Sequence, residues 1–246
     1  IERRPDAFVI AGDLFDTPRP SNIVVKNTIA IFNRLEEAGI DTIVQGGNHD
    51  TPQMRTTTSA FESLMEINYK HIHFVYYGIE RIKIGNTEFI VVPHLSIADG
   101  FEPTELNPDY KNNRHSVLVL HGVADGSDIF KQVDESREMP LGAHILNMGH
   151  TYIALGHYHK RSEVRKNAWY AGSLENGSFG PDVQHEKGGL LVDLDDDEAL
   201  AARVIDLLEQ PQLAQTLVAN GRKEAEKYSV AHVRDVLVPL LQKVAP

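Results

Sequence analysis

The chain contains no cysteine among its 246 residues. This absence excludes disulfide bonds, thiolate metal sites and a cysteine nucleophile, and it suits a reducing cytosol. Long apolar runs are absent too, because no stretch approaches the roughly 18 residues that a membrane span requires. No secretory signal stands at the start, where the charged segment IERRPD opens the sequence. We therefore expect a cytoplasmic protein without a membrane partner.

Positive charge is scarce, with 24 Lys and Arg against 35 Asp and Glu and a net charge of −11. Such a chain does not coat nucleic-acid phosphates through bulk electrostatics, which argues against a pure DNA-binding module. A nuclease remains compatible, because bound divalent cations reverse the local field at a site. The initiator Met is also absent. A strand is predicted from Phe8, so we interpret Ile1 as a start inside a domain.

Four apolar runs end in residue types that bind metals. They are DAFVIAGDLFD (6–16), DTIVQGGNHD (41–50), SVLVLHG (116–122) and YIALGHYH (152–159). Each is typical of a buried strand followed at once by Asp, Asn-His, His or His-x-His. A sheet can gather the ends of separate strands into one site. Oxygen and nitrogen donors without a thiol are what a hydrolytic metal centre needs.

The remaining pattern predicts an α/β domain. Helices are expected at 22–38 and 57–67, with strands at 8–11, 42–45, 117–120, 153–155, 168–171 and 189–194. The β-rich section 71–94 is interpreted as an antiparallel meander with a tight turn at Gly85-Asn86, and 99–114 as a polar loop. After the charged segment 193–198 only helical patterns follow, so we place a domain boundary between 195 and 196.

The residues at the strand ends differ in what they offer. The carboxylate of Asp13 follows Gly12 and can bridge two cations roughly 3.5–4 Å apart. Asn48 offers a neutral oxygen, and imidazole nitrogens come from His121, His157 and His159. His49 directly follows a ligand, so it can lie near the site without coordination and protonate a leaving oxygen.

The order of these residues resembles the calcineurin-like metallophosphoesterases, over roughly residues 1–195. That family carries D-x-H, GD-x-x-D, GNH-[DE], a lone H and GH-x-H. The last four stand here as Gly12-Asp13…Asp16, Gly47-Asn48-His49-Asp50, His121-Gly122 and Gly156-His157-Tyr158-His159. Within the family the chain is most similar to the nuclease subunit of SbcC–SbcD-type DNA repair complexes. The marks are GDLFDTPRPS, Arg55 after GNHD, GHYHKR, and WYAGSLENGSFG followed by EKGGLLVDL.

The resemblance implies a four-layer α/β/β/α sandwich and a DNA repair exonuclease with a two-metal mechanism. It implies two manganese ions, bridged by Asp13. Asn48, His121 and His157 would complete one site, and His159 would bind at the other. His49 would steer the phosphodiester and protonate the leaving group. The implied partners are DNA and an SMC-like ATPase of the SbcC type, and a homodimer is left open.

The chain departs from the family in one motif. Residues 1–12 contain one aspartate, Asp6, and no histidine, so D-x-H is absent. We therefore expect a sandwich without its first strand, one metal site short of two ligands, and impaired turnover. Two alternatives remain open. The substrate can be a small phosphodiester or phosphomonoester, or the chain can be a non-catalytic metal-binding fragment.

Other residues receive weaker predictions. Arg19, Arg55 and Arg161 are candidates for binding substrate phosphate, or are ordinary surface arginines. Asp16 and Asp50 are expected to make hydrogen bonds in turns or to ligands, and Tyr158 to line the pocket. The remaining histidines are expected not to bind metal, His150 being the strongest candidate among them; they are His71, His73, His94, His115, His144, His150, His185 and His232.

The tail at 196–246 is a separate matter. It resembles the C-terminal helices of glycosyltransferases with two Rossmann-like domains, over about fifty residues and without a catalytic motif. A fusion of unrelated fragments would explain it. The alternatives are a generic amphipathic tail or helices that dock the ATPase partner. No donor-sugar site is present, so we do not infer glycosyltransferase activity.

Overall fold

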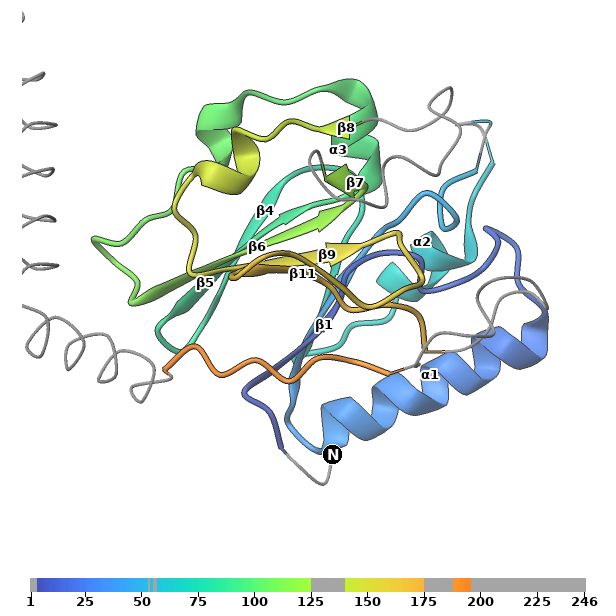
Figure 1. Ribbon diagram of the computed structural model, residues 1–246. Coiled ribbons are helices and arrows are strands. Elements are labelled where there is room, and N and C mark those ends of the chain that lie inside the picture. The colour runs from blue at the N-terminus through green and yellow to red at the C-terminus, as the bar shows by residue number, and fades with distance from the viewer. Residues whose placement is uncertain (1–3, 53, 55–56, 125–139, 175–187, 196–246) are drawn as a thin grey trace, which may run out of the picture. The chain divides into compact units, whose positions relative to one another are not determined.

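The computed structural model describes residues 4–52, 54, 57–124, 140–174 and 188–195 (Figure 1). These belong to the compact unit Ile1–Leu194, apart from residue 195. The helices expected after 196 lie outside the described residues, so the predicted boundary stays a prediction. No helix in the described part of the chain is long and apolar enough to cross a membrane.

The first sheet is entirely parallel. Its strands β1 (Ala7–Ile10), β2 (Asp41–Gln45) and β3 (Ile72–Val75) lie in the order β1-β2-β3. Helix α1 (Asn22–Glu37) links the first two, and the chain turns after it at Gly39 with φ 65°. Helix α2 (Ala60–Met65) is shorter than predicted. It begins at Ser59, whose side chain forms a capping box with Glu62.

The second sheet is mixed and has the order β10-β11-β9-β6-β5-β4. Strands β5, β6, β9 and β11 run parallel, while β4 and β10 join antiparallel at the two edges. The bounds are β4 Glu80–Ile84, β5 Thr87–Val92, β6 His115–His121, β9 Tyr152–Gly156, β10 Ser162–Arg165 and β11 Ala168–Tyr170. A separate parallel pair joins β7 (Val123–Ala124) to β8 (Pro140–Leu141).

Three apolar clusters hold the layers together. The central cluster packs Ile43 and Val75 of the first sheet against Val91 and Val119 of the second. A second cluster covers the outer face of the first sheet with Phe32 of α1 and residues of α2. The third covers the second sheet with short helical segments, α3 (His94–Asp99), η1 (Pro103–Leu106) and η3 (Ile145–Asn147). The predicted α/β class is confirmed, with two mixed or parallel sheets between helices.

The structure corrects parts of the predicted pattern. Only β4 and β5 form the expected hairpin, turning at Gly85 with φ 56°. Strand β3 instead pairs parallel with β2, so the section 71–94 is divided between two sheets. Residues 189–194 form no strand, and the predicted loop 99–114 contains η1. The edge strand β10 was not predicted, because its sequence SEVR carries no apolar alternation.

Candidate metal centre

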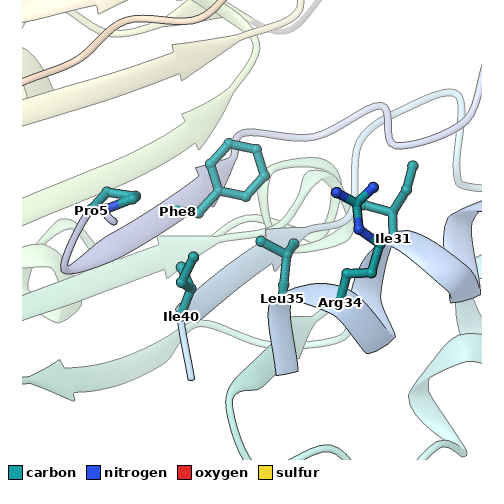
Figure 2. A pocket seen from close by; sticks show the side chains of 6 residues that line it. All are labelled: Pro5, Phe8, Ile31, Arg34, Leu35 and Ile40. Carbon is teal, nitrogen blue, oxygen red and sulfur yellow. The ribbon is translucent and has the colours of Figure 1, made fainter. Parts of the chain in front are cut away.

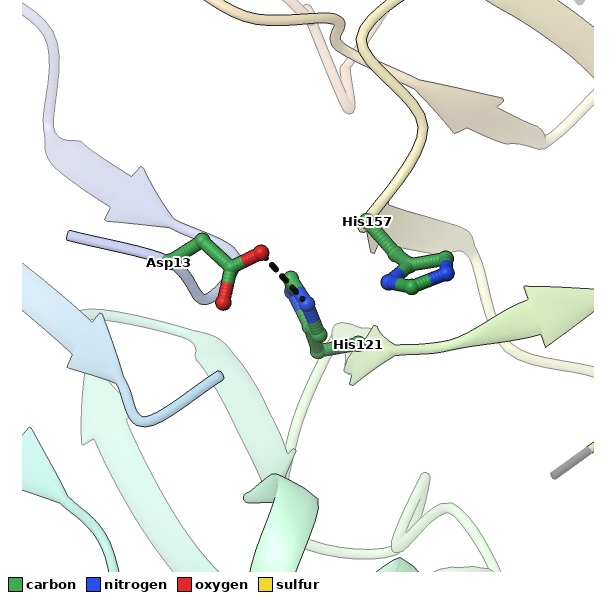
Figure 3. Close-up of side chains that lie close together, drawn as sticks. All are labelled: Asp13, His121 and His157. Carbon is green, nitrogen blue, oxygen red and sulfur yellow. Dashed lines mark ion pairs between the residues drawn. The ribbon is translucent and has the colours of Figure 1, made fainter. Parts of the chain in front are cut away.

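Four strands of the two sheets bring ligand residues to one place at their carboxyl ends. Asp13 follows β1, Asn48 follows β2, His121 ends β6, and His157 follows β9. Strands β6 and β9 are neighbours, and His121 lies in register with Gly156. Figure 3 shows Asp13 and His157 on either side of the His121 ring. Packing of the two sheets therefore converts four separate motifs into one cluster.

The donor atoms in the cluster lie within 4.8 Å of one another for Asp13, His121 and His157. His121 Nε2 is 3.1 Å from Asp13 Oδ2 and 2.8 Å from Asn48 Oδ1. His157 Nδ1 is 3.1 Å from the same Asn48 oxygen. Distances of about 3 Å between donors are those of ligands that share one cation at about 2.0–2.2 Å.

The tautomer of His121 supports a cation at this point. Its Nδ1–H donates to the carbonyl oxygen of Ala11 at 2.8 Å, so Nε2 carries the lone pair of the neutral ring. That lone pair faces a carboxylate oxygen of Asp13 and the amide oxygen of Asn48, which are both acceptors. His121 is 1% exposed, so water access is small. A divalent cation would satisfy all three atoms at once, and nitrogen and oxygen ligands fit Mn²⁺ or Zn²⁺.

Two glycines allow the ligand loops to approach this closely. Gly12 adopts φ 84°, and a Cβ there would stand 2.0 Å from His121 Nδ1. At Gly156 a Cβ would stand 1.6 Å from the carbonyl oxygen of Ala11, a backbone atom that cannot move aside. Asp13 and His157 follow these glycines and have positive φ themselves, 50° and 100°. Such strain in non-glycine residues is typical of functional sites.

Asp50 ties the two loops of the first sheet together. Its buried carboxylate accepts backbone N–H groups from Leu14 (3.2 Å) and Phe15 (3.0 Å) after β1, and from Gly47 (2.9 Å) after β2. Burial raises the pKa of Asp50 to about 6, although these N–H groups oppose the shift. Asp50 thus has the predicted hydrogen-bonding role and does not belong to the donor cluster.

His49 lies beside the cluster, and its ring is held from one side. Its backbone N–H donates to Asp13 Oδ1 at 2.8 Å, and its Nδ1–H donates to the Asp16 carbonyl oxygen at 2.8 Å. Burial lowers the pKa of His49, but the Asp16 carbonyl and the charges of Asp13, Asp16 and Asp50 outweigh burial and raise it. These contacts leave Nε2 as the ring atom directed away from Asp16.

The electrostatics of the cluster also reveal a residue that sequence reasoning missed. Burial raises the pKa of Asp13, but His121 and the His49 N–H outweigh it, so the carboxylate stays ionised. His94, at the start of α3, feels the charges of His121, Asp13 and His157. Burial is the main cause that lowers its pKa, and the two imidazoles add to it. His94 thus lies near the cluster, a proximity that no local motif signalled.

The other predicted site residues lie elsewhere or outside the described part. His159 is exposed and stands outside the group formed by Asp13, His121 and His157. Arg19 and Arg161 are exposed, and Arg55 is not among the described residues. His150 is buried against Ser116, whose Oγ lies 2.9 Å from its Nδ1, and it joins no donor group. The roles of His159 and the three arginines stay predictions.

An apolar cleft of about 210 Å³ lies away from the donors, between β1 and α1 (Figure 2). Phe8 and Ile31 line it together with Pro5, Leu35, Ile40 and Arg34. Phe8 belongs to the early part of β1, whereas Asp13 follows the end of that strand. The cleft offers no carboxylate, amide or imidazole, so it is not part of the candidate metal centre.

Fold and cluster define a metal-dependent hydrolase of layered α/β type. Residues 1–185 match the family of calcineurin-like phosphoesterases, and the chain belongs to that family. The match includes all five predicted metal ligands and His49.

Curated relatives are DNA repair proteins and nucleases. The chain is 26% identical over 249 residues to the DNA double-strand break repair protein Mre11 of Saccharolobus solfataricus, covering 97% of this chain and 61% of that protein. It is 31% identical over 178 residues to the protein of the same name from Aeropyrum pernix, covering 65% and 40%. One subunit of the nuclease SbcCD of Staphylococcus epidermidis is 24% identical, with 84% and 60% covered. The chain thus spans less than two thirds of each of these relatives.

Proposed function

We propose that the chain is a metal-dependent phosphodiesterase that hydrolyses DNA at its ends. The observation that carries the proposal is the convergence of Asp13, Asn48, His121 and His157 at the carboxyl ends of four strands. Membership of the phosphoesterase family supports the reaction class. The relatives named for double-strand break repair and for nuclease activity support DNA as the substrate.

The metal in this proposal is manganese. Asp13, Asn48, His121 and His157 would hold one ion, and the same carboxylate with His159 would serve a second. Cations bound there supply charge that polarises a phosphoryl oxygen and offsets the negative charge of the substrate. The negative overall charge of the chain makes this local reversal necessary for a polyanionic substrate.

His49 is the proposed acid. Its Nδ1–H is committed to the Asp16 carbonyl, so the ring is oriented and Nε2 is directed to a phosphodiester beside the donor cluster. A proton on Nε2 can then pass to the leaving oxygen. Because the His49 backbone N–H also binds Asp13 Oδ1, the acid and the ligand carboxylate are positioned by one contact.

Substrate and partner contacts complete the proposal. Arg19, Arg55 and Arg161 are proposed to bind the phosphates that flank the cleaved bond, because guanidinium groups pair with phosphate in bidentate fashion. The relative named as one subunit of the SbcCD nuclease supports an assembly with an SMC-like ATPase of the SbcC type. A homodimer belongs to the same proposal.

The test uses purified chain, Mn²⁺ and end-labelled linear duplex DNA, with a covalently closed circle as the substrate without ends. We expect Mn²⁺-dependent cleavage of the linear duplex only. His49→Ala should lower the rate by about 100-fold or more and leave Mn²⁺ binding intact. His144→Ala is the matched control, because His144 is exposed and distant in sequence from the four motifs. An unchanged rate in His49→Ala would contradict the assigned role.

Two further substrates separate the alternatives. A chromogenic diester and a chromogenic monoester are assayed beside the duplex, under the same Mn²⁺ conditions. Hydrolysis of either small ester without cleavage of DNA would show that the chemistry is right and the substrate class wrong. Mn²⁺ binding without hydrolysis of any of the three would identify a non-catalytic metal-binding chain.

A further inference from the structure

A second group of metal-ligand side chains lies at the opposite end of the first sheet. Asp41 opens β2, His71 directly precedes β3, and His73 lies within β3. Asp41 Oδ1 is 2.9 Å from His71 Nδ1 and 3.8 Å from His73 Nε2. The five residues of β2, at about 3.3 Å each, separate this group from the Asn48 loop by roughly 16 Å.

The register of the sheet puts the three side chains on one face. His73 pairs with Ile43 and Ile72 with Thr42 in the parallel ladder. Side chains alternate between faces along a strand, so Asp41 lies on the face of Ile43, and His71 on that of His73. The His-x-His spacing therefore places two imidazoles beside one carboxylate.

The backbone around His71 is fixed by hydrogen bonds that do not involve its ring. Its carbonyl oxygen accepts the Thr42 N–H at 2.7 Å, and its own N–H donates to Glu36 Oε2 at 2.8 Å. The other oxygen of Glu36 accepts the Lys70 N–H at 2.9 Å. These bonds hold the start of β3 against β2 and α1, so the ligand geometry does not depend on a free loop.

We propose that Asp41, His71 and His73 form a second divalent-cation site, for a first-row transition-metal ion such as Zn²⁺. Two imidazoles and one carboxylate are a donor set that binds such ions and leaves positions for water. Ligands of one tetrahedral Zn²⁺ stand roughly 3.3 Å apart, and the two distances from Asp41 Oδ1 lie on either side of that value.

The site is accessible and needs little rearrangement. The side chains of His71, Asp41 and His73 are 26%, 32% and 35% exposed, so a hydrated ion can reach them. A small rotation of the His73 ring shortens its distance to the shared position. Glu80 provides a further carboxylate close by: burial raises its pKa, and the charge of His73 opposes that shift. This assignment replaces the prediction that His71 and His73 bind no metal.

The experiment counts Zn²⁺ per full chain by calorimetric titration. The wild-type chain should bind one more Zn²⁺ than the double variant His71→Asn/His73→Asn, and Asp41→Asn should weaken that extra site by about tenfold or more. The matched control His144→Asn removes an exposed histidine outside the group and should keep the full count. Equal counts for wild type and double variant would overturn the proposal. So would loss of the same ion in the control.

A measurement on the wild-type chain guards against variants that misfold. Co²⁺ added as a paramagnetic probe should broaden the imidazole resonances of both His71 and His73. Sharp resonances of these rings at saturating Co²⁺ would overturn the proposal without any substitution. The site shares no ligand with the Asp13–His121–His157 cluster, so its failure leaves DNA hydrolysis untouched, and failure of DNA hydrolysis leaves the Zn²⁺ count untouched.

Discussion

The two ends of the parallel strands carry the same residue types in different settings. At the carboxyl ends, Asp13, Asn48, His121 and His157 come from four distant segments and meet in a partly or fully buried cluster. At the amino ends of β2 and β3, Asp41, His71 and His73 are exposed and come from two adjacent strands. The first group exists only when both sheets pack, whereas the second needs one strand pair. Chemistry at the carboxyl ends therefore depends on the whole fold.

The largest expected effect breaks the carboxyl-end group through its backbone. Gly156→Ala places a methyl group 1.6 Å from the Ala11 carbonyl oxygen, so β9 and the β1 loop must separate. We expect a loss of about 3 kcal/mol or more in the free energy of unfolding, measured by urea denaturation. Gly78→Ala is the control, because nothing lies within 4 Å of its added carbon. Equal stability of the two variants would contradict the close approach.

A somewhat smaller effect removes one ligand from the same group. His121→Ala deletes the Nε2 atom that lies 3.1 Å from Asp13 Oδ2 and 2.8 Å from Asn48 Oδ1. Mn²⁺ affinity should fall by about 100-fold or more, since even partners that only orient ligands cost 10- to 100-fold. Calorimetric titration measures the loss. An affinity within threefold of the wild type would separate His121 from the metal centre.

A pH experiment concerns the amino end of the second sheet, where burial governs His150. Burial lowers the pKa of His150 to about 4, below the ordinary value of about 6.5, so the folded state holds the ring neutral. The unfolded chain takes up this proton first as the pH falls, so the stability is full above about 6.5 and is lost toward 4. The loss is about 2 to 3 kcal/mol.

His150→Gln should flatten this part of the stability curve, because the variant has no imidazole to protonate. Urea denaturation between pH 4 and pH 7 measures the difference between variant and wild type, which removes the contribution of the carboxylates common to both. Identical slopes for the two proteins would show that His150 does not titrate as a buried ring.

The smallest expected effect tests whether the two ends are independent. His73→Ala removes an imidazole at the amino ends and leaves every ligand of the carboxyl-end cluster in place. Mn²⁺-dependent hydrolysis of linear DNA should stay within about twofold of the wild type, because surface changes remote from a site cost little. A tenfold loss would show that the two groups are coupled through β2 and β3.

The sequence predicted the local features and missed those that depend on partners. Strand ends at Asp13, Asn48, His121 and His157 followed from apolar runs, and the β4–β5 hairpin from Gly85-Asn86. The pairing of β3 with β2 could not be predicted, because an apolar run specifies a strand but not its neighbour. The contribution of His94 was missed for the same reason, since it reaches the cluster through packing rather than through a motif.

The carboxylate of Asp50 has a mechanical consequence. Because it accepts N–H groups from Leu14, Phe15 and Gly47, the loops after β1 and β2 hang on a single pivot. A push on one loop, such as that exerted by an incoming DNA strand, is transmitted to the other instead of opening a gap between Asp13 and Asn48. The two loops therefore behave as one lever arm, and their ligands keep their spacing under load.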